Sequence, residues 1–220
     1  MRWKQLWTMA VAATMAIPTI AEAQFMTYNS QVSFLAAITN PGVDTFTGFA
    51  LGTAASPLTR SAGAYSYKAS VTDDVNVFGA GTVGDPWLSI DFAPNVLTFS
   101  TFTSGVAAVG GNFFGSDADG LFQSGNIVVT YVDATGTYSQ TLVAPTGDTF
   151  FGVVSLTGAM ISFSIQAVQP SDEESLWPTV DNLTLGQGTS ASVPEPAPAA
   201  LIITGLLAMG LVSRRRNSAR

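Results

Sequence analysis

The side chains able to do chemistry in this sequence are carboxylates, since none of its 220 residues is histidine or cysteine. That absence removes imidazole as a base, the usual zinc sites, and the Ser-His and Cys-His nucleophile pairs. Asp44 lies beside the first expected strand, and Asp181 and Asn182 lie on the last. If those strands are neighbours, carboxylate and amide oxygens could meet around a structural calcium ion. The alternative is that Asp181 and Asn182 only end a strand or cap a turn.

Glycoside hydrolysis would need two carboxylates held a short distance apart, one of them with a raised pKa. Residues 24–193 contain only two glutamates, Glu173 and Glu174, and adjacent side chains of an extended segment point apart. Aspartate pairs could do the same work, but no pattern singles one out. The segment 117–120 begins like a calcium loop, yet its later ligand positions are apolar, so we expect a solvated turn. The sequence favours a protein that is not an enzyme.

Sugar binding without catalysis needs an exposed aromatic face, on which a pyranose ring stacks, and nearby polar groups that fix the hydroxyls. Trp177 lies between the acidic segment 172–174 and Pro178, a pattern typical of a surface, and is the candidate ligand-binding residue. Trp87 is a second candidate. For both residues the alternative is a place in the core.

The elements that must position these residues are short. Asn29 and Ser30 can cap a helix that runs to about Ile38, where breakers at 40–42 end it. After it, runs of β-branched and aromatic residues separated by Gly, Pro, Asn and Asp indicate strands. These strands are expected near residues 43–47, 65–71, 75–78, 87–92, 96–102, 106–114, 127–132, 137–143, 150–155, 161–168 and 179–185.

Alternation is clearest in residues 97–102 and 161–165, which place one apolar face inward and a hydroxyl face outward. Residues 133–136 form a hairpin turn with Gly136 where a positive φ is expected. Many short antiparallel strands in one domain predict an all-β fold, a two-sheet sandwich of jelly-roll or concanavalin-like type with a short N-terminal helix.

The central part of the chain, between the two terminal segments described below, is strongly acidic. Residues 24–193 contain 13 acidic side chains and two basic ones, Arg60 and Lys68, a net charge of −11. Nucleic acid is excluded as a partner, because nothing would neutralise its phosphates. The acidity fits divalent cations, cationic surfaces or solubility outside the cell. Without cysteine, the domain must be held by packing and hydrogen bonds, with a bound calcium ion as an optional addition.

The N-terminus has the pattern of a secretory signal. Arg2 and Lys4 form a positive region, and residues 6–17 form an apolar one. Ala21 and Ala23 supply the small residues at the recognition positions, so cleavage is expected before residue 24, after passage through the Sec translocon. A first transmembrane helix is the alternative, but the apolar segment is short and interrupted by proline.

The C-terminus has the pattern of a membrane anchor. Pro194, Glu195 and Pro196 precede an uncharged run, residues 197–212, that would span ~24 Å as a helix, just below the usual spanning length. Three arginines follow the run: Arg214, Arg215 and Arg216. Cations at this place stop transfer on the cytoplasmic side, so everything before the run should lie beyond the membrane.

This order of proline-rich motif, transmembrane helix and arginine cluster resembles the PEP-CTERM sorting signal of Gram-negative bacteria. The resemblance implies that the protein crosses the inner membrane, is anchored there transiently, and is cut near Pro194-Glu195-Pro196 by an exosortase-type peptidase. Release to the cell surface or extracellular matrix would follow. An ordinary single-pass tail anchor with a proline-rich hinge is the alternative.

The exterior part is similar to ectodomains of PEP-CTERM proteins. The residues that carry this similarity are 34–37, 44–49, 109–114, 150–155 and 180–186. It looks like a concanavalin-like or carbohydrate-module-like sandwich, and that resemblance implies an ion between the first and last strands.

Four segments are therefore expected: a signal peptide (1–23), a β-sandwich ectodomain (24–186), a flexible linker (187–192) and a sorting signal (193–220). The expected function is that of an exported surface or matrix protein whose sandwich has a structural or adhesive role in exopolysaccharide. A carbohydrate-binding module and, less favoured, a polysaccharide hydrolase are the alternatives.

Overall fold

The computed structural model describes residues 24–103, 105–170 and 175–188. The described residues form fifteen strands and one short α-helix, and the last strand is the longest. In chain order the elements are β1 (Phe25–Tyr28), α1 (Gln31–Ala36), β2 (Ile38–Asp44), β3 (Gly52–Ala54), β4 (Leu58–Ala62), β5 (Tyr65–Val71), the 3-10 turn η1 (Thr72–Asp74), β6 (Val77–Thr82), β7 (Asp85–Ile90), β8 (Leu97–Ser100), β9 (Ala108–Ser116), β10 (Phe122–Gln123), β11 (Ile127–Asp133), β12 (Thr137–Leu142), β13 (Phe150–Ser155), β14 (Met160–Ala167) and β15 (Trp177–Gly188).

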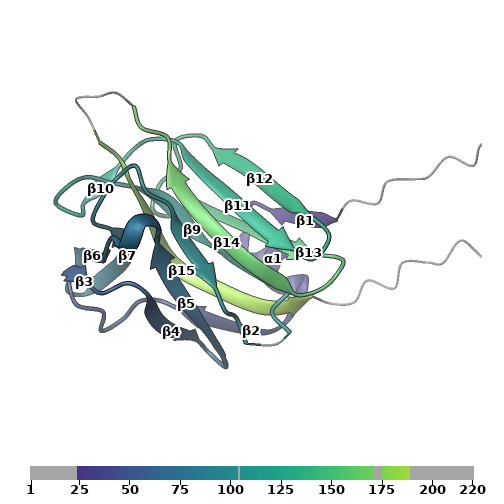
Figure 1. Cartoon of the computed structure of the whole chain (residues 1–220). Helices are drawn as coiled ribbons and strands as arrows, with labels where there is room; N and C mark the ends of the chain where they lie inside the picture. The colour runs from purple at the N-terminus through teal and green to yellow at the C-terminus, as the bar shows by residue number, and fades with distance from the viewer. Residues whose placement is uncertain (1–23, 104, 171–174, 189–220) are drawn as a thin grey trace, which may run out of the picture.

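The strands form two antiparallel sheets packed face to face (Figure 1). The first sheet has nine strands in the order β1-β13-β9-β15-β7-β6-β3, with β10 paired to β9 and β2 paired to β15. The second has six strands in the order β12-β11-β14-β8-β5-β4. The expected all-β, two-sheet sandwich with a short N-terminal helix is confirmed. Its jelly-roll or concanavalin-like subclass stays a prediction.

Aromatic side chains fill the space between the sheets. Phe99, Tyr131 and Phe163 project from the second sheet and are fully buried. The ring centroid of Phe163 lies 4.5 Å from that of Phe99 and 5.3 Å from that of Tyr131. Phe113 reaches Phe163 from the first sheet at 5.3 Å. Each such buried ring contributes about 2–3 kcal/mol through removal of apolar surface from water, so this cluster joins the two layers.

Helix α1 covers part of the outer face of the first sheet. Ser30 caps it by accepting a hydrogen bond from the Ser33 N–H at 3.5 Å. Phe34 is its one buried residue and packs on Phe150, with ring centroids 5.3 Å apart. Gly152 makes room for that ring, since a Cβ there would lie 2.6 Å from it. A short helix is therefore held by one aromatic anchor rather than by its own length.

The sequence prediction missed the short strands β1, β3, β4 and β10, and it was wrong in the segment 40–42. The helix ends at Ala36, and Asn40, Pro41 and Gly42 lie inside strand β2 rather than after the helix. Proline is tolerated there because β2 pairs only with β15 and so lies at the edge of the ladder. Asn40 has a φ of 50°, which bends the strand at the same place.

Strand β15 is the longest element and runs along the centre of the first sheet. It pairs with β9 on one side and, on the other, with β7 near Val180 and with β2 from Leu183 onward. At ~3.3 Å per residue its two ends, Trp177 and Gly188, are roughly 35 Å apart. A side chain at Gly188 would lie 3.6 Å from the carbonyl of Ser155, the residue that Phe25 pairs with. The described chain thus begins and ends at the same end of the sandwich, away from Trp177 (Figure 1).

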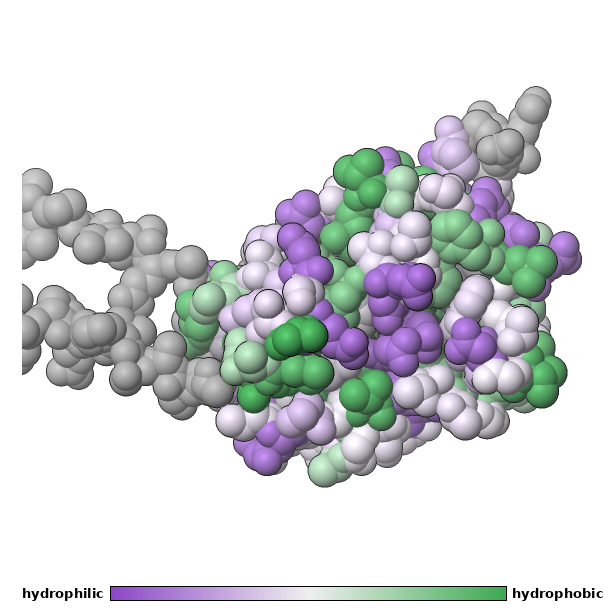
Figure 2. Space-filling view, turned by 180° about the vertical axis from the view of Figure 1, so that it is seen from behind, coloured by the Kyte–Doolittle hydropathy of each residue, from purple (hydrophilic) through white to green (hydrophobic). Residues whose placement is uncertain are grey.

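Figure 2 shows the face opposite to that of Figure 1. Hydrophilic residues gather near its middle, and hydrophobic residues form small separate groups around them. Scattered apolar residues of this kind are ordinary on a soluble surface.

Candidate functional site

Trp177, the candidate ligand-binding residue, begins strand β15 and is half-buried. Its indole N–H makes no hydrogen bond to any residue within the ranges that the structure describes. Its ring packs against the hydrophobic core and also lines a surface pocket, so Trp177 combines the core position and the binding position that the sequence left open. Ligand binding by Trp177 stays a prediction.

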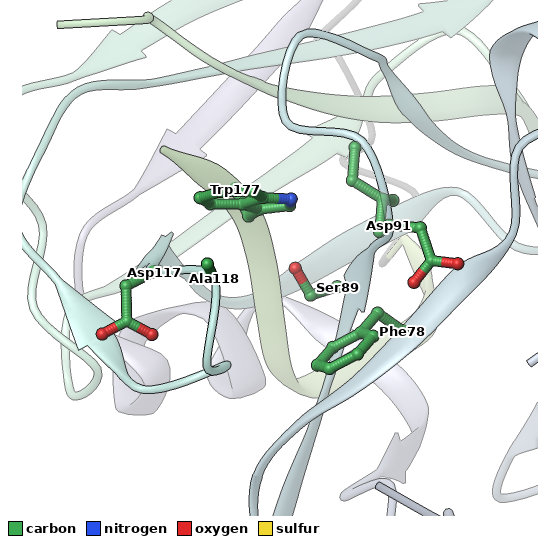
Figure 3. A pocket seen from close by; sticks show the side chains of 7 residues that line it. Phe78, Ser89, Asp91, Asp117, Ala118 and Trp177 are labelled. Atoms are coloured by element: carbon green, nitrogen blue, oxygen red, sulfur yellow. The ribbon is translucent and has the colours of Figure 1, made fainter. Parts of the chain in front are cut away.

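Trp177 lines a surface pocket of about 230 Å³, which we call the Trp177 pocket. In Figure 3 Ser89 lies between the rings of Trp177 and Phe78, while Asp91 and Asp117 lie on opposite sides. The lining residues are Phe78, Ser89, Ile90, Asp91, Asp117, Ala118 and Trp177. Two aromatic rings, with a hydroxyl between them and a carboxylate on either side, offer stacking surfaces and hydrogen-bond acceptors in one small space.

Asp117 is held in the pocket wall by its own turn. Its Oδ1 accepts hydrogen bonds from the N–H groups of Asp119 at 3.0 Å and Leu121 at 2.9 Å. Gly120 completes the turn with a φ of 76°, in the region that favours glycine. The expected turn at 117–120 is confirmed. Oδ2 makes no hydrogen bond to the described part of the chain, so it is free to accept one from a ligand.

Asp91 forms the opposite wall, directly after strand β7. Its Oδ1 accepts a hydrogen bond from the Thr53 hydroxyl at 3.2 Å, and its N–H donates to the Asn76 carbonyl at 3.1 Å. These contacts fix the carboxylate from two neighbouring segments. As in Asp117, one carboxylate oxygen is engaged and the other has no partner among the residues described.

The base of the pocket is a buried hydroxyl network. The Thr179 hydroxyl donates to Ser89 at 3.1 Å and lies 2.7 Å from the Ser116 hydroxyl. Ser89 in turn donates to the Pro178 carbonyl at 3.2 Å. All three hydroxyls are buried and partnered, so they support the pocket instead of acting as nucleophiles.

Trp87, the other candidate, has a structural environment. Its ring meets Phe114 edge-on with centroids 4.9 Å apart, and its indole N–H donates to Asp85 at 3.4 Å. Because its donor is engaged and its face is covered, Trp87 is placed as a packing residue.

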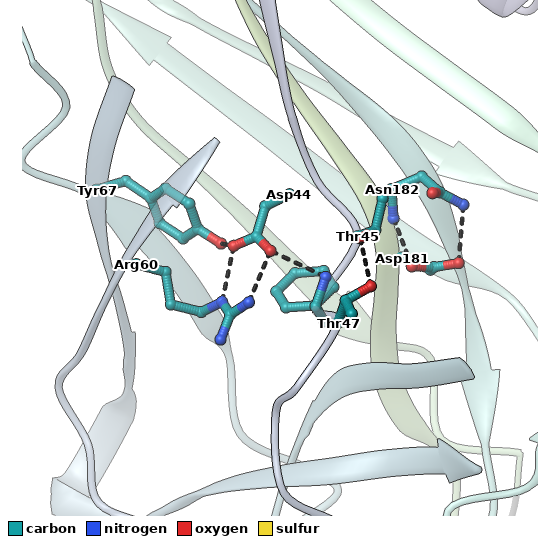
Figure 4. A network of polar contacts seen from close by, with 8 residues as sticks. Asp44, Thr45, Thr47, Arg60, Tyr67, Asp181 and Asn182 are labelled. Atoms are coloured by element: carbon teal, nitrogen blue, oxygen red, sulfur yellow. Dashed lines mark hydrogen bonds and ion pairs between the residues drawn. The ribbon is translucent and has the colours of Figure 1, made fainter. Parts of the chain in front are cut away.

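The predicted calcium ligands lie on neighbouring strands, but Asp44 forms an ion pair with Arg60. Asp44 lies opposite Leu183, so β2 and β15 are neighbours as expected. Its carboxylate accepts hydrogen bonds from Arg60 Nε and Nη2, both at 2.7 Å, and from the Tyr67 hydroxyl at 2.7 Å (Figure 4). The Phe46 N–H donates to it at 2.9 Å. The guanidinium therefore occupies the place beside Asp44 that the sequence had assigned to calcium.

The ion pair between Asp44 and Arg60 spans the two sheets and is largely buried, with the side chains 5% and 18% exposed. Hydrogen bonding to Asp44 raises the pKa of Arg60 in spite of burial. Burial, followed by the charge of Asp44, raises the pKa of Tyr67 well above its ordinary value. Arg60 therefore stays charged and Tyr67 stays protonated at neutral pH, and the network is structural.

Asp181 and Asn182 lie at a β-bulge in β15. The ladder with β9 shifts register between Asp181 and Thr184, and Asn182 has a φ of 52°. Asp181 accepts hydrogen bonds from the Asn182 N–H at 2.6 Å and from its side-chain amide at 2.8 Å. Val180 and Leu183 face the core, so Asp181 faces away from it, unlike Asp44. Calcium binding by Asp181 and Asn182 stays a prediction.

Burial raises the pKa of Asp181 to about 6, with a further contribution from the charges of Asp85 and Asp44 and an opposing one from the Asn182 N–H. Within the described residues, no three His, Cys, Asp or Glu side chains are grouped so that they could hold a metal ion. The surroundings of Asp181 therefore disfavour its charged form, and among the described residues it does not belong to a group of three acids that could hold a metal ion.

The sorting residues Pro194, Glu195 and Pro196, the arginines 214–216 and the cleavage residues Ala21 and Ala23 all lie outside the described residues. The described part of the chain has no helix with the length and apolar character needed to cross a bilayer.

Sequence reasoning identified Trp177 but missed Phe78, Ser89, Asp91 and Asp117. Phe78, Ser89 and Asp91 belong to the β6–β7 hairpin, whereas Asp117 follows β9. These residues meet Trp177 because β15 lies between β9 and β7 in the first sheet. The one signal available was the acidic turn at Asp117.

No family model matches the chain, and no curated protein does. One similar solved structure is TmCBM61 in complex with β-1,4-galactotriose, with 13% identity over 55% of this chain and 88% of that one, at a TM-score of 0.26. Another is the K2 cleaved adhesin domain of Lys-gingipain, with 14% identity over 74% of this chain and 99% of that one, also at 0.26. Both likenesses are remote.

Proposed function

We propose that this protein is an exported, non-enzymatic β-sandwich that adheres to exopolysaccharide and binds a sugar unit in the Trp177 pocket. The observation that carries the proposal is the pocket that Trp177 lines together with Phe78, in which Asp91 and Asp117 lie on opposite sides and the indole N–H has no hydrogen-bond partner among the described residues. A pyranose ring needs an apolar face to stack on and acceptors for its hydroxyls, and the pocket supplies both.

The position of the pocket suits a protein displayed outside a membrane. β15 includes Gln187 and Gly188, the first two residues of the segment expected to be the linker, so that boundary was wrong by two residues. The rest of the proposed linker and the sorting signal continue from Gly188, at the far end of β15 from Trp177. A protein held by that end would direct the pocket away from the bilayer. The proposal includes the PEP-CTERM-type route: a signal peptide cut after Ala23 and an exosortase-type cut near Pro194-Glu195-Pro196, supported by the sequence at both ends.

A glycan array with the full chain, followed by titration calorimetry on the glycans that bind, tests sugar recognition. Trp177→Ala should abolish binding, because it removes the aromatic ring on which the sugar stacks. Trp177→Phe keeps a smaller aromatic ring and should retain part of the binding. The matched control is Trp87→Phe, which removes an indole outside the pocket and should leave binding unchanged. Binding that survives Trp177→Ala would rule out this pocket as the site.

Hydrolysis of polysaccharide is the alternative function for which the pocket gives a specific observation, because two carboxylates line it. An assay of turnover on the same glycans separates binding from hydrolysis. We expect no release of reducing ends. Release that disappears in Asp91→Asn or Asp117→Asn would instead assign these residues as a catalytic pair.

The sorting route has its own test. Mass spectrometry of the exported protein should find an N-terminus at Gln24 and a C-terminus near Pro194-Glu195-Pro196. Recovery of residues 197–220 on the exported protein would contradict transient anchoring.

A further inference from the structure

The Trp177 pocket contains two carboxylates that no cation among the described residues neutralises. Asp91 and Asp117 lie on its opposite sides (Figure 3), and neither forms an ion pair with a Lys or Arg side chain of the described ranges. Arg60 is paired with Asp44, and Lys68 lies on β5 of the second sheet, which does not line the pocket. The pocket is therefore a place of uncompensated negative charge.

Each carboxylate is fixed through one oxygen and leaves the other oxygen free. Oδ1 of Asp117 accepts two backbone N–H groups of its own turn, and Oδ1 of Asp91 accepts the Thr53 hydroxyl. The second oxygen of each has no hydrogen-bond partner among the residues that the structure describes. A cationic ligand would thus meet acceptors that are already oriented, which reduces the entropy lost on binding.

The aromatic walls of the pocket favour the same kind of ligand. Trp177 and Phe78 are both half-buried, and the Ser89 hydroxyl lies between their rings. The face of an aromatic ring attracts a cation through its quadrupole, and tryptophan does so most strongly. The same face also stacks on a sugar ring. Rings and carboxylates together therefore suit a small ring that carries a positive charge.

An organic cation fits this set of groups better than a metal ion does. Calcium takes about six to eight oxygen ligands, and among the described residues no three His, Cys, Asp or Glu side chains are grouped to hold a metal ion. An ammonium group has three N–H donors and can be held by one or two fixed acceptors. At about 230 Å³ the pocket is smaller than the ~300–1,000 Å³ clefts that enclose drug-sized ligands, so it suits a single sugar ring.

We propose that the Trp177 pocket selects a hexosamine unit whose amino group is free and protonated, an inference that rests on the proposed sugar pocket and names its ligand class. The sugar ring stacks on the indole, and its ammonium group is attracted by Asp91 and Asp117. A neutral hexose leaves both carboxylates without a counter-ion, an N-acetylated unit lacks the charge, and a uronic acid is repelled. The net charge of −11 in residues 24–193 also attracts a cationic polysaccharide from a distance.

The test uses the β-1,4-linked trisaccharides of glucose, glucosamine and N-acetylglucosamine, which differ only at C2. Titration calorimetry with the full chain at pH 6, where the amino groups are largely protonated, should give glucosamine an affinity about tenfold above that of glucose, as one charge-assisted hydrogen bond predicts. N-acetylglucosamine should bind no better than glucose. Asp91→Asn and Asp117→Asn should each reduce the preference for glucosamine, and the double variant should abolish it.

An acidic domain attracts any polycation, so the controls separate the pocket from the overall charge. Asp148→Asn removes the same charge at an exposed residue outside the pocket and should leave the preference unchanged. Trp177→Ala keeps the charge and should abolish glucosamine binding. Trilysine, which carries ammonium groups without a sugar ring, should bind weakly and equally to the wild type and to Trp177→Ala.

The outcomes distinguish this inference from the proposed function. Equal affinity for glucosamine and glucose, with both lost in Trp177→Ala, would overturn the amino-sugar inference and leave the sugar pocket standing. Glucosamine binding that survives Trp177→Ala, or that falls as much in Asp148→Asn as in Asp91→Asn, would reflect overall charge and overturn the inference. Tight binding of trilysine that depends on Trp177 would assign the pocket to a cationic peptide. If no trisaccharide binds, the inference fails, and the glycan array decides the proposed function separately.

Discussion

Asp133 shows how one buried carboxylate can organise a turn. It accepts hydrogen bonds from the hydroxyls of Ser155 at 2.6 Å and of Thr157 and Thr135 at 2.7 Å, and from two backbone N–H groups of its own hairpin. Burial disfavours its charge, but these hydrogen bonds outweigh burial and lower its pKa. The sequence predicted the hairpin at 133–136, but Gly136 does not have the positive φ that was expected of it. It did not predict the three hydroxyl donors, two of which lie more than 20 residues away.

We expect Asp133→Asn to lower the free energy of unfolding by about 2 kcal/mol at pH 7, because hydrogen bonds to a charged group are worth about 1.5–3 kcal/mol. A folded-state pKa below the unfolded value means that this contribution is present above about pH 4 and lost as the pH falls further. Urea denaturation at pH 7 and pH 3 measures both. Asp148→Asn, at an exposed aspartate, is the control, and an equal loss in both variants would contradict the assignment.

The pKa of Asp181 is shifted in the opposite direction to that of Asp133. Its folded-state pKa of about 6 lies above the unfolded value of about 3.9, so the folded protein binds this proton more tightly than the unfolded chain does. The cost of the charged form is therefore present above about pH 6 and disappears as the pH falls towards 4.

The free energy of unfolding of Asp181→Asn, measured relative to the wild type, should accordingly be higher at pH 8 than at pH 4.5. We expect a difference of about 1 kcal/mol, because solvent screening at a partly hydrated bulge reduces the effect. Thermal unfolding of both proteins across pH 4–8 gives the difference curve. A flat difference would show that Asp181 titrates normally. If calcium binds there, added calcium would reverse the trend by stabilising the ionised carboxylate.

At the scale of elements, the Asp44–Arg60 pair links β2 of the first sheet to β4 of the second. Arg60→Met should destabilise the fold by about 3–5 kcal/mol, because it leaves the Asp44 carboxylate buried without a counter-ion. Asp44→Asn with Arg60→Met should cost less than Arg60→Met alone, since the uncompensated charge is gone. Chemical denaturation measures the series, with Lys68→Met, at an exposed cation, as the control. A loss below 1 kcal/mol for Arg60→Met would mean that the pair is solvated.

Local pattern was enough for the long strands and not for the short ones. β11 and β14 alternate regularly and were predicted nearly at their observed bounds, since one of their faces is buried in the core. β3 and β10 have three and two residues, and they exist only because β6 and β9 offer edges to pair with. Strand pairing over long sequence separations decides such elements, and a local window does not contain it.

At the scale of the molecule, the length of β15 places the Trp177 pocket and the end of the described chain at opposite ends of one strand. Trp177 begins it beside the pocket, and Gly188 ends it beside Ser155, next to the start of the described chain. Because β15 is paired on both sides, this axis is held rigidly by the sheet. A protein carried by its C-terminal end would present the pocket outward, which is the orientation that the proposed binding of a polysaccharide outside the cell requires.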